Sequence, residues 1–436
     1  MNEINSANEN MKMIRSVRGM RDLFGKQADI FCTVMDGIKR VVLRHGYSYI
    51  ETPILEFTQL FARSIGESTD VVGKEMFSFM DRSGQNISLR PEGTASVVRA
   101  FIEHNLVQKL PQKLFYYGPM FRYDRPQRGR YRQFFQFGVE NLGENSPLSD
   151  VDVIVLASEV LANFNIKNTL YLNSLGDVET RNKYKAKLVE YFSQYSEELS
   201  TDSKLRLTNN PLRILDSKNA KDQEIVYGAP SIINFLTKDA AKFFERVQEA
   251  LSLLGIAFQL DKTLVRGLDY YDHTTFEFKT CIQDNGTEND LAVLGGGRYN
   301  GLIEQIGGTS VPAVGLAFGV DRLMLAYNAE KIVRKNIISI LFVTQNEEND
   351  ALLLCTKLRQ HGFSVIMPLD GSLTKRTKCS DRAMAICALF IGEDEVRDAT
   401  VKCKFFTSTQ DFPESTEIII NKSEIIQFFH NLFVDS

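Results

Sequence analysis

Arginine is the residue type whose spacing first suggests chemistry in this chain. The segment FRYDRPQRGRYRQFFQFGVE, residues 121–140, interleaves aromatic side chains with five arginines: Arg122, Arg125, Arg128, Arg130 and Arg132. An arginine at a strand end can grip a phosphate through two parallel hydrogen bonds, and a neighbouring aromatic ring can stack on a base. A solvated basic hairpin tip has the same composition. The charge pattern alone therefore leaves nucleotide binding and a plain hairpin both open.

Two further segments set an ionic side chain beside the start of a helix. LRPEGT, residues 89–94, puts Glu92 between a predicted strand and a predicted helix. Glu92 can accept hydrogen bonds from an ammonium group there, or it can simply favour the helix N-terminus. GLAFGVDRLML, residues 315–325, puts Arg322 at the start of a helix after a glycine-rich strand. Arg322 can meet a ligand, or it can form a surface ion pair with Asp321 or another acid.

Several common catalytic patterns are missing from the sequence. It contains no P-loop, no G-x-S-x-G and no H-E-x-x-H. Its five histidines do not cluster, and its six cysteines form no C-x-x-C pair, so neither a histidine triad nor a zinc ribbon is indicated. A formal net charge of −4 argues against a protein that coats nucleic acid non-specifically. It leaves room for a local basic patch that docks one RNA.

The elements that must position these arginines mix helices and short strands. Apolar residues at helical spacing predict helices over 27–45 and 150–164. Runs of β-forming residues predict strands over 47–54, 76–80, 87–90, 114–121, 134–139, 276–280 and 291–294. Residues 177–255 are charged and helical in pattern, and they predict an inserted helical subdomain.

Residues 336–436 predict a separate small α/β domain with a mixed sheet. The alternating signals are strands over 337–343, 361–368 and 386–392, with helices over 348–360 and 373–384. The polar stretch 328–336 is the predicted boundary. Residues 1–13 are predicted to be a disordered tail without a signal peptide, and no apolar run approaches the roughly 20 residues of a membrane helix.

Taken in order, these segments resemble the class II aminoacyl-tRNA synthetases. The helix and strand that end at Pro53 resemble motif 1, residues 121–140 resemble motif 2 and residues 315–325 resemble motif 3. LVRGLDYYDHTTFEF at 264–278 and GGGRYNGL at 295–302 are similar to signatures of the histidyl-tRNA synthetase family. LNSLGD, TNNPLRILDSK and the chain from residue 337 are similar to this family too, so the likeness runs from about residue 14 to the end.

The resemblance implies an α+β fold. Residues 14–335 are expected to form a class II catalytic domain, an antiparallel β-sheet flanked by helices with the insertion at about 177–255. Residues 336–436 are expected to form an α/β anticodon-binding domain. The implied enzyme is an ATP-dependent aminoacyl-tRNA ligase, which activates L-histidine with ATP and Mg²⁺ to histidyl-adenylate and pyrophosphate and then loads tRNA(His). It is expected to be a cytoplasmic homodimer joined through motif 1, with no membrane contact, no protein-held metal and no tightly bound organic cofactor.

The resemblance also assigns residues to the amino acid. Glu92 and Thr94 would hold the α-amino group of histidine. Glu140 and Tyr271 would face the imidazole ring, with Tyr270 alongside. A buried acceptor such as Glu140 suits a ring N–H, because an apolar isostere would leave that acceptor unpaired. Without the resemblance, the two tyrosines would be interpreted as core aromatics, one buried and one exposed at its edge.

A second set of residues is assigned to ATP. Arg122 would contact the α-phosphate, Phe134 would stack on adenine, and Gln136 would bind near both the histidine carboxylate and the α-phosphate. Arg322 would reach the γ-phosphate. Arg266 would sit across the α-phosphate from Arg122 and do work that a metal ion does in related synthetases. Arg266, Arg122 and Gln136 are thus the expected catalytic residues.

The C-terminal domain offers candidate contacts with tRNA phosphates, for which solvated surface side chains are an equal alternative: Lys375, Arg376 and Lys378. Some positions depart from the family pattern. Phe135 stands where the family often has His or Tyr, and Asn300 stands where it usually has Asp. Asp124 and Asp321 replace the more usual Glu. The loss of His or Tyr at position 135 puts any hydrogen bond from that side chain in doubt.

Two other functions compete with an active ligase. One is a synthetase-like regulatory subunit, which binds a partner and has no aminoacylation activity. Such paralogues typically lack the anticodon domain and lose active-site signatures, and this chain keeps both. The other is a synthetase-derived RNA-binding module inside a larger protein, which the sequence favours less because no appended domain is evident.

Overall fold

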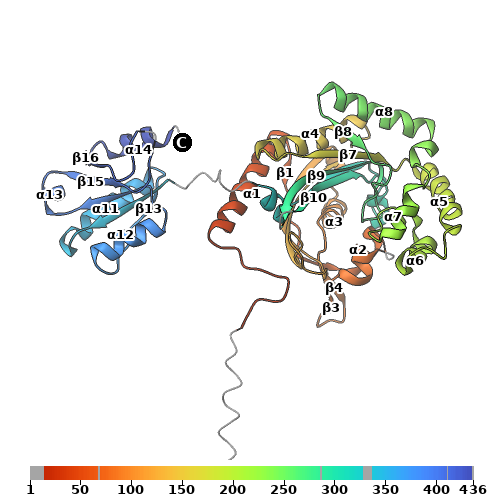
Figure 1. Ribbon diagram of the computed structural model, residues 1–436, viewed down its shortest axis with the longest axis horizontal. Coiled ribbons are helices and arrows are strands. Elements are labelled where there is room, and N and C mark those ends of the chain that lie inside the picture. The colour runs from red at the N-terminus through yellow and green to blue at the C-terminus, as the bar shows by residue number, and fades with distance from the viewer. Residues whose placement is uncertain (1–13, 67–68, 285–286, 328–335, 410, 435–436) are drawn as a thin grey trace, which may run out of the picture. The chain divides into compact units, whose positions relative to one another are not determined.

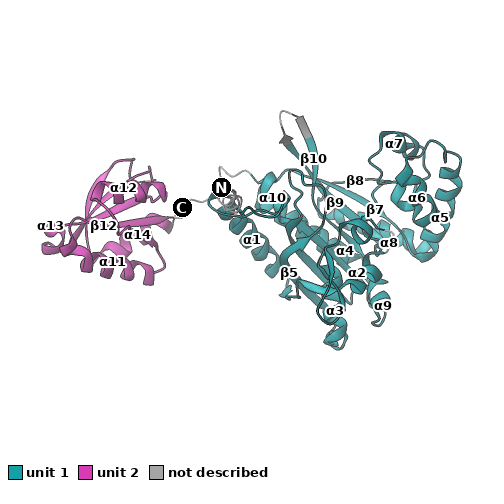
Figure 2. Cartoon of the chain, turned by 90° about the horizontal axis from the view of Figure 1, so that it is seen from below, with its two compact units in different colours: residues 1–329 teal, residues 330–436 magenta. Residues whose placement is uncertain are grey.

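The chain divides into two units, residues 1–329 and 330–436, coloured teal and magenta in Figure 2. The computed structural model describes residues 14–66, 69–284, 287–327, 336–409 and 411–434. The predicted tail at 1–13 and nearly all of the predicted boundary at 328–336 lie outside the described residues. Among the helices of the described ranges, none combines the length and the apolar character needed to cross a membrane.

An eight-stranded sheet lies at the centre of unit 1 (Figure 1). Its six inner strands are antiparallel, in the spatial order β5 (Gln112–Phe121), β6 (Gln133–Leu142), β11 (Ala313–Gly319), β10 (Thr287–Arg298), β9 (Asp272–Asp284) and β7 (Thr169–Ser174). The two edge strands pair in parallel: β1 (Ser48–Tyr49) with β5, and β8 (Phe258–Leu260) with β7. The predicted antiparallel sheet is therefore confirmed for the inner strands, and the edges make the whole sheet mixed.

The strand predicted over 47–54 is mostly wrong. Only Ser48–Tyr49 pairs with the large sheet, and the chain then turns into a small three-stranded sheet. That sheet has the order β2 (Leu55–Phe57), β4 (Asn86–Leu89) and β3 (Ser78–Met80). Proline has no N–H to donate to a ladder, so Pro53 cannot continue a central strand.

Strand β6 shows how the sheet aims side chains at a site. Successive side chains of a strand point to opposite faces, so Phe134, Gln136 and Glu140 share one face and Phe135 and Phe137 share the other. On the second face, Phe135 packs edge-on against Phe31 of helix α1 (Lys26–Arg44), with ring centroids 4.9 Å apart. The polar members of β6 are thereby left on the face opposite α1.

Helices cover both faces of this sheet (Figure 1). On the α1 face, α1 contacts α4 (Pro147–Asn163) and α10 (Val320–Ala326). On the other face, helix α3 (Thr94–Glu103) shares a core with the even-numbered side chains Leu114 and Tyr116 of β5. Helices α2 (Thr58–Ile65) and α9 (Leu302–Ile306) contact α3 on that side. Polar β6 residues can face a pocket only where these helices leave the sheet uncovered.

The segment between β7 and β8 is helical. It contains α5 (Val178–Ser193), α6 (Thr201–Asn209), the 3-10 turn η3 (Pro211–Ile214), α7 (Ala220–Tyr227) and α8 (Lys238–Leu253). Apolar residues of this segment, such as Leu188 and Ile214, belong to the same core cluster as Leu114 and Tyr116 of the sheet. We call residues 178–253 the insertion segment, and its core is continuous with that of unit 1.

Unit 2 is an α/β domain with a mixed five-stranded sheet, as predicted. The strand order is β13 (Ser364–Ile366), β12 (Ile337–Phe342), β14 (Cys387–Ile391), β15 (Thr400–Phe405) and β16 (Glu417–Asn421). The first three strands are parallel and the last two pair antiparallel. The strand predicted over 361–368 is shorter, because His361 and Gly362 end helix α11 (Glu348–Gln360), with Gly362 at a φ of 88°.

Candidate active site

A cavity of about 380 Å³ lies in unit 1, on the face of the sheet that carries Phe134, Gln136 and Glu140. Ten residues proposed from the sequence all line it: Glu92, Thr94, Arg122, Phe134, Gln136, Glu140, Arg266, Tyr270, Tyr271 and Arg322. They come from segments far apart in the chain. Strand β6, the start of α3, the start of α10 and the loop before β9 bring them together. The structure thus places every predicted amino-acid and ATP residue in one pocket.

Glu140 lies in the most enclosed part of this pocket. Its side chain is 1% exposed, and Thr94 donates a hydrogen bond from Oγ1 to Oε1 of Glu140 at 2.8 Å. The hydroxyl of Tyr299 donates to the other carboxylate oxygen. Burial raises the pKa of Glu140 to about 8, although both hydroxyl donors favour the ionised form. Near neutral pH the carboxyl therefore holds a proton that a polar ligand can displace.

A glycine on the neighbouring strand makes room for this carboxyl. Gly315 of β11 is paired with Glu140 in the sheet register. A Cβ atom at Gly315 would overlap Oε2 of Glu140 and lie 2.6 Å from the carbonyl oxygen of Val139. Only glycine leaves that space free, so the glycine at position 315 is a packing requirement of the pocket floor.

Glu92 combines both roles that the sequence left open. Its two carboxylate oxygens accept the backbone N–H groups of Thr94 at 2.7 Å and Ala95 at 2.8 Å, so it satisfies the first donors of helix α3. The same carboxylate lines the cavity. Burial raises the pKa of Glu92 above its usual value. Burial removes the water that stabilises an ionised carboxylate, so a cationic ligand group next to Glu92 would stabilise its charge.

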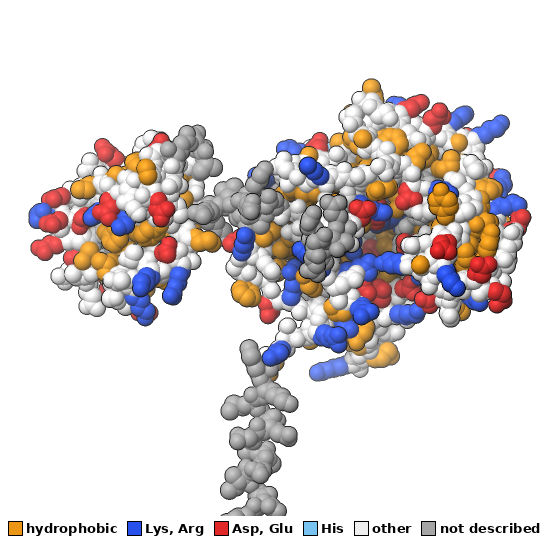
Figure 3. All heavy atoms as spheres, viewed as in Figure 1, with side chains coloured by type: hydrophobic (Ala, Val, Ile, Leu, Met, Phe, Trp, Pro, Cys, Tyr) orange, Lys and Arg blue, Asp and Glu red, His pale blue; other side chains and the backbone are white. Residues whose placement is uncertain are grey.

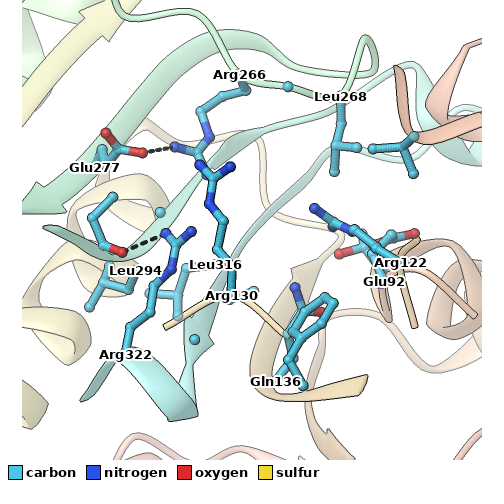
Figure 4. Close-up of a pocket in the computed structure, with 18 of the residues that line it drawn as sticks. Glu92, Arg122, Arg130, Gln136, Arg266, Leu268, Glu277, Leu294, Leu316 and Arg322 are labelled. Carbon is cyan, nitrogen blue, oxygen red and sulfur yellow. Dashed lines mark hydrogen bonds and ion pairs between the residues drawn. The ribbon is translucent and has the colours of Figure 1, made fainter. Parts of the chain in front are cut away.

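Of the five arginines that line the cavity, Arg213 belongs to the insertion segment, and the other four gather at the other end of the cavity (Figure 4). Arg130, Arg266 and Arg322 lie on one side of the close-up, and Arg122 lies opposite them beside Glu92. Burial, and then the charge of Arg130, lower the pKa of Arg322. On the face of unit 1 drawn in Figure 3, basic side chains crowd the middle with acidic ones among them. Such clustering of like charges is costly without a bound anion.

Each guanidinium at this end is held by a specific acceptor. Arg122 donates from Nε to the carbonyl oxygen of Pro91 at 2.9 Å, and Arg266 donates from Nη1 to Glu277 at 2.7 Å. Arg322 donates from Nη1 to a main-chain oxygen of β10, that of Ala292, at 2.8 Å. These anchors fix the arginines before any ligand arrives, which is how preorganised charge acts.

The surface ion pair considered for Arg322 is not formed. Asp321 instead pairs with Arg21 and accepts the backbone N–H of Phe135 at 2.8 Å. The shorter acid at position 321 therefore ties the N-terminal segment to β6. Arg322 is left to face the cavity.

The face of β6 between the two ends carries Phe134 and Gln136. The guanidinium carbon of Arg122 lies 5.4 Å from the centroid of the Phe134 ring. The buried Oε1 atom of Gln136 has no hydrogen-bond partner among the described residues. A buried amide oxygen without a partner is costly, so a ligand group that pairs with it would be stabilised.

The sequence reasoning assigned no role to several polar residues that line the pocket, among them Arg130, Glu277 and Tyr299. Arg130 stood in the arginine run without an assigned role. Glu277 and Tyr299 lie within the two signature segments, but nothing in their spacing marks them as pocket residues. The triple glycine at 295–297 was a sequence feature that could have pointed to this part of the pocket, because a Cβ at Gly295 would overlap the guanidinium of Arg266.

The predicted tRNA contacts of unit 2 lie on helix α12 (Leu373–Arg382). Lys375 and Lys378 are exposed. Arg376 is buried, and its guanidinium carbon lies 4.0 Å from the centroid of the Phe342 ring. The prediction of a surface phosphate contact is therefore wrong for Arg376, because packing against the sheet takes its side chain away from solvent.

Comparison with known proteins agrees with this geometry. The sequence profile of the family described as Histidyl-tRNA synthetase matches residues 19–323. The histidine–tRNA ligase of Acaryochloris marina is 46% identical over 403 residues, which cover 91% of this chain and 93% of that protein. That of Rhodospirillum rubrum is 46% identical over 393 residues, or 90% of this chain and 94% of that protein.

Solved structures lead to the same family. The apo histidyl-tRNA synthetase of S. aureus superposes with a TM-score of 0.77 and 32% sequence identity, covering 96% of this chain and all of that one. The coverage takes in residues of both units. A family profile that spans most of the chain, near-full-length relatives and a shared fold lead to one conclusion: the chain belongs to the histidyl-tRNA synthetase family.

Proposed function

We propose that this chain is a histidine–tRNA ligase that works in two steps. It joins histidine to the α-phosphate of ATP, releasing pyrophosphate, and then transfers histidine from the adenylate to the 3′ end of tRNA(His). One observation carries the proposal: a single pocket joins a cluster of four arginines at one end to the buried carboxyl of Glu140 at the other. Histidine needs the buried carboxyl, and the polyphosphate of ATP needs the arginines.

The enclosed end suits histidine. Glu92 and Thr94 would hold the α-amino group, and the Glu140 carboxylate would accept an imidazole N–H, with Tyr270 and Tyr271 beside the ring. Both tyrosines are buried and line the cavity. Side chains of similar size without an N–H would leave the Glu140 acceptor unpaired, which is a strong basis for rejecting them.

The arginine end suits the reacting phosphate. Attack of the histidine carboxylate on the α-phosphorus forms a new P–O bond and breaks the bond to pyrophosphate, so negative charge grows on the phosphate oxygens. Arg122 and Arg266 would clamp the α-phosphate from opposite sides, and Arg322 would meet the γ-phosphate. Phe134 would stack on adenine, with Gln136 beside the α-phosphate and the histidine carboxylate. Holding two anions together in this way is itself a large part of catalysis.

Mg²⁺ is proposed to enter with ATP. It usually binds substrate phosphates, water and only one or two carboxylates. Within the described ranges, no group of three or more His, Cys, Asp or Glu side chains is arranged to hold a metal ion. Glu277 and Asp216 line the cavity near the arginines and could serve as single carboxylate ligands. The ion would neutralise charge on the β- and γ-phosphates.

A homodimer joined through motif 1 is also proposed. The small sheet that follows motif 1 in the chain would extend this interface, because it exposes an apolar stripe in which Phe57 and Phe79 flank Ile87 on neighbouring strands. Phe57 is 57% exposed and Phe79 is 47% exposed. Exposed aromatic side chains that share a sheet face are typical of an interface. The enzyme would work in the cytoplasm, where tRNA is charged for protein synthesis.

Phe57→Asp should shift the protein toward monomers, because a carboxylate on this stripe opposes burial. Sedimentation velocity at low concentration is the measurement. Leu253→Asp is a matched control, since Leu253 is 82% exposed at the end of α8. Monomers in the unsubstituted chain would contradict the dimer.

Amino-acid-dependent exchange of pyrophosphate into ATP tests the activity. Exchange should depend on histidine and on no other amino acid, and its absence with all of them would count against the ligase. A regulatory subunit would show none. The complete set of pocket residues and the presence of unit 2 favour the ligase over that alternative.

Arg266→Ala should abolish exchange while the melting temperature stays close to that of the parent chain. The loss follows because half of the clamp on the α-phosphate is removed, which is expected to cost about 100-fold or more. Near-normal exchange in this variant would refute the role of Arg266. Exposed Arg246→Ala is the control, since Arg246 forms an ion pair along its own helix, with Glu249 at 3.3 Å.

A further inference from the structure

The loop that carries Arg266 is held by the insertion segment. Residues 266–271 connect the region after β8 to the start of β9. The carbonyl oxygen of Gly267 accepts a hydrogen bond from Nη2 of Arg213 at 3.1 Å. Two residues further on, Oδ1 of Asp269 accepts one from Nδ2 of Asn210 at 3.0 Å. Asn210 joins α6 to η3 and Arg213 lies within η3, so both donors come from the turn at residues 210–214.

A third contact continues this series. Nη1 of Arg181, on helix α5, donates to the carbonyl oxygen of Tyr271 at 3.2 Å. Insertion side chains therefore reach every second residue of the loop. The residues that precede those contacts, namely Arg266, Leu268 and Tyr270, all line the active-site cavity. Each hydrogen bond is thus one residue away from a side chain that faces the substrate pocket.

The same insertion element also reaches the loop after α2. Arg206 of α6 donates from Nη1 to the carbonyl oxygen of Arg213 at 3.2 Å and from Nη2 to Asp70 at 3.1 Å. Asp70 lines the active-site cavity. The backbone N–H of Asp269 donates to Ile65 at 3.2 Å. Helix α6 and the turn at residues 210–214 together therefore link two loops that border the pocket.

Hydrogen bonds, and not close packing alone, set the distance between this turn and the loop. A second cavity of about 160 Å³ lies beside them and is lined from both, including Asn210, Arg213, Leu268 and Asp269. Apolar packing also joins the two, because Leu212 and Ile214 of η3 belong to the same core cluster as Tyr270 and Tyr271. The space beside the hydrogen bonds means that this packing alone does not fix the loop. Loss of one donor would therefore let the loop shift.

We infer that Asn210 and Arg213 are positioning residues for the adenylation step, acting through the loop 266–271. The inference rests on the proposed function, in which Arg266 clamps the α-phosphate and Tyr270 and Tyr271 border histidine. Arg213 fixes the residue next to Arg266 and should therefore govern the rate of the chemical step. Asn210 fixes the residue next to Tyr270 and should govern the grip on histidine.

The test uses the full chain and histidine-dependent pyrophosphate exchange, with the melting temperature measured for each variant. Arg213→Ala should lower kcat by about 10- to 100-fold with little change in KM for ATP, since a displacement of about 1 Å can cost that much. Arg213→Lys, which keeps an N–H donor, should recover part of the rate. Asn210→Ala should mainly raise KM for histidine. Arg246→Ala, in the same segment, should behave like the parent chain.

The outcomes separate this inference from the proposed function. No exchange in the parent chain would count against the ligase itself. If the parent chain is active and both alanine variants match Arg246→Ala, the positioning role is overturned. It is also overturned if every loss of rate follows a lowered melting temperature, because the contacts would then only stabilise the fold. A split between kcat and KM at parental melting temperatures supports it.

Discussion

At the scale of single residues, the carboxyl of Glu140 should make histidine binding depend on pH. Its pKa of about 8 means that it is largely protonated at pH 7, whereas an imidazole N–H needs the carboxylate as acceptor. KM for histidine should therefore fall severalfold between about pH 7 and pH 9, above the range where free imidazole itself titrates. Glu140→Gln should flatten this dependence. A parent profile as flat as that of the glutamine variant would contradict the assignment.

The same group also affects stability, with a definite sign. Its usual pKa is 4.5, so between pH 4.5 and 8 the unfolded chain releases a proton that the folded chain keeps. The free energy of unfolding contributed by Glu140 therefore falls as pH rises through this window, by up to about 1.4 kcal/mol per pH unit. Equilibrium denaturation of the parent and of Glu140→Gln at several pH values would show it.

The place of a residue in the pocket was predictable from the sequence where a signature fixed it. Gln136 and Glu140 lie four residues apart on one strand, and a strand alternates its side chains, so they could be expected on one face. Arg122 could be expected beside them because it directly follows the neighbouring strand. Glu277 was missed although Arg266 lies in the same segment, because the spacing of the two residues does not show that the loop before β9 turns Arg266 back toward this strand. Tyr299 was missed because its partner Glu140 is distant in sequence and meets it only through the fold. Burial of Arg376 was missed for the same reason.

At the scale of elements, the glycine-rich strand β11 determines how much room the pocket has. Gly315→Ala should raise KM for histidine strongly, because the added Cβ would displace the Glu140 carboxyl. Overpacking should also cost about 1–3 kcal/mol of stability. Gly301→Ala is the control, since a Cβ at Gly301 meets no atom within 4 Å. An unchanged KM for histidine in Gly315→Ala would contradict this, because it would show that the Glu140 carboxyl can move aside without loss of binding.

Element types followed from local patterns better than element ends did. The helix predicted over 27–45 is α1, which spans Lys26–Arg44, because its apolar stripe is regular. The strands predicted over 47–54 and 361–368 shrink to two and three residues. Pairing partners and helix caps decide strand length, and neither is visible in a local window.

At the scale of the whole molecule, the two units should separate activation from tRNA recognition. All pocket residues lie in unit 1, and unit 2 has a core of its own. A chain that ends at residue 329 should therefore keep histidine-dependent exchange within about an order of magnitude, since the arginine cluster is intact. Its charging of tRNA(His) should fall far more. Equal losses in both assays would contradict a division of labour between the units.

Domain order could be predicted because periodicity changes along the chain, from mixed elements to a charged helical stretch and then to alternating strands and helices. The packing of the insertion segment against the catalytic core could not be predicted from the sequence. The sequence suggested an inserted subdomain, whereas Leu188 and Ile214 share one core with Leu114. Long-range packing of this kind depends on which helices meet, and composition does not record it.

The proton on Glu140 also predicts that histidine binding is coupled to the release of a proton from the protein. When histidine binds near neutral pH, the carboxyl must ionise to accept the ring N–H, so up to one proton leaves each site. The measured enthalpy of binding should then change with the ionisation enthalpy of the buffer. Histidine binding would thus replace the proton on Glu140 by a hydrogen bond from the ligand. Without the ligand, the neutral carboxyl would leave no unpaired buried charge at this position.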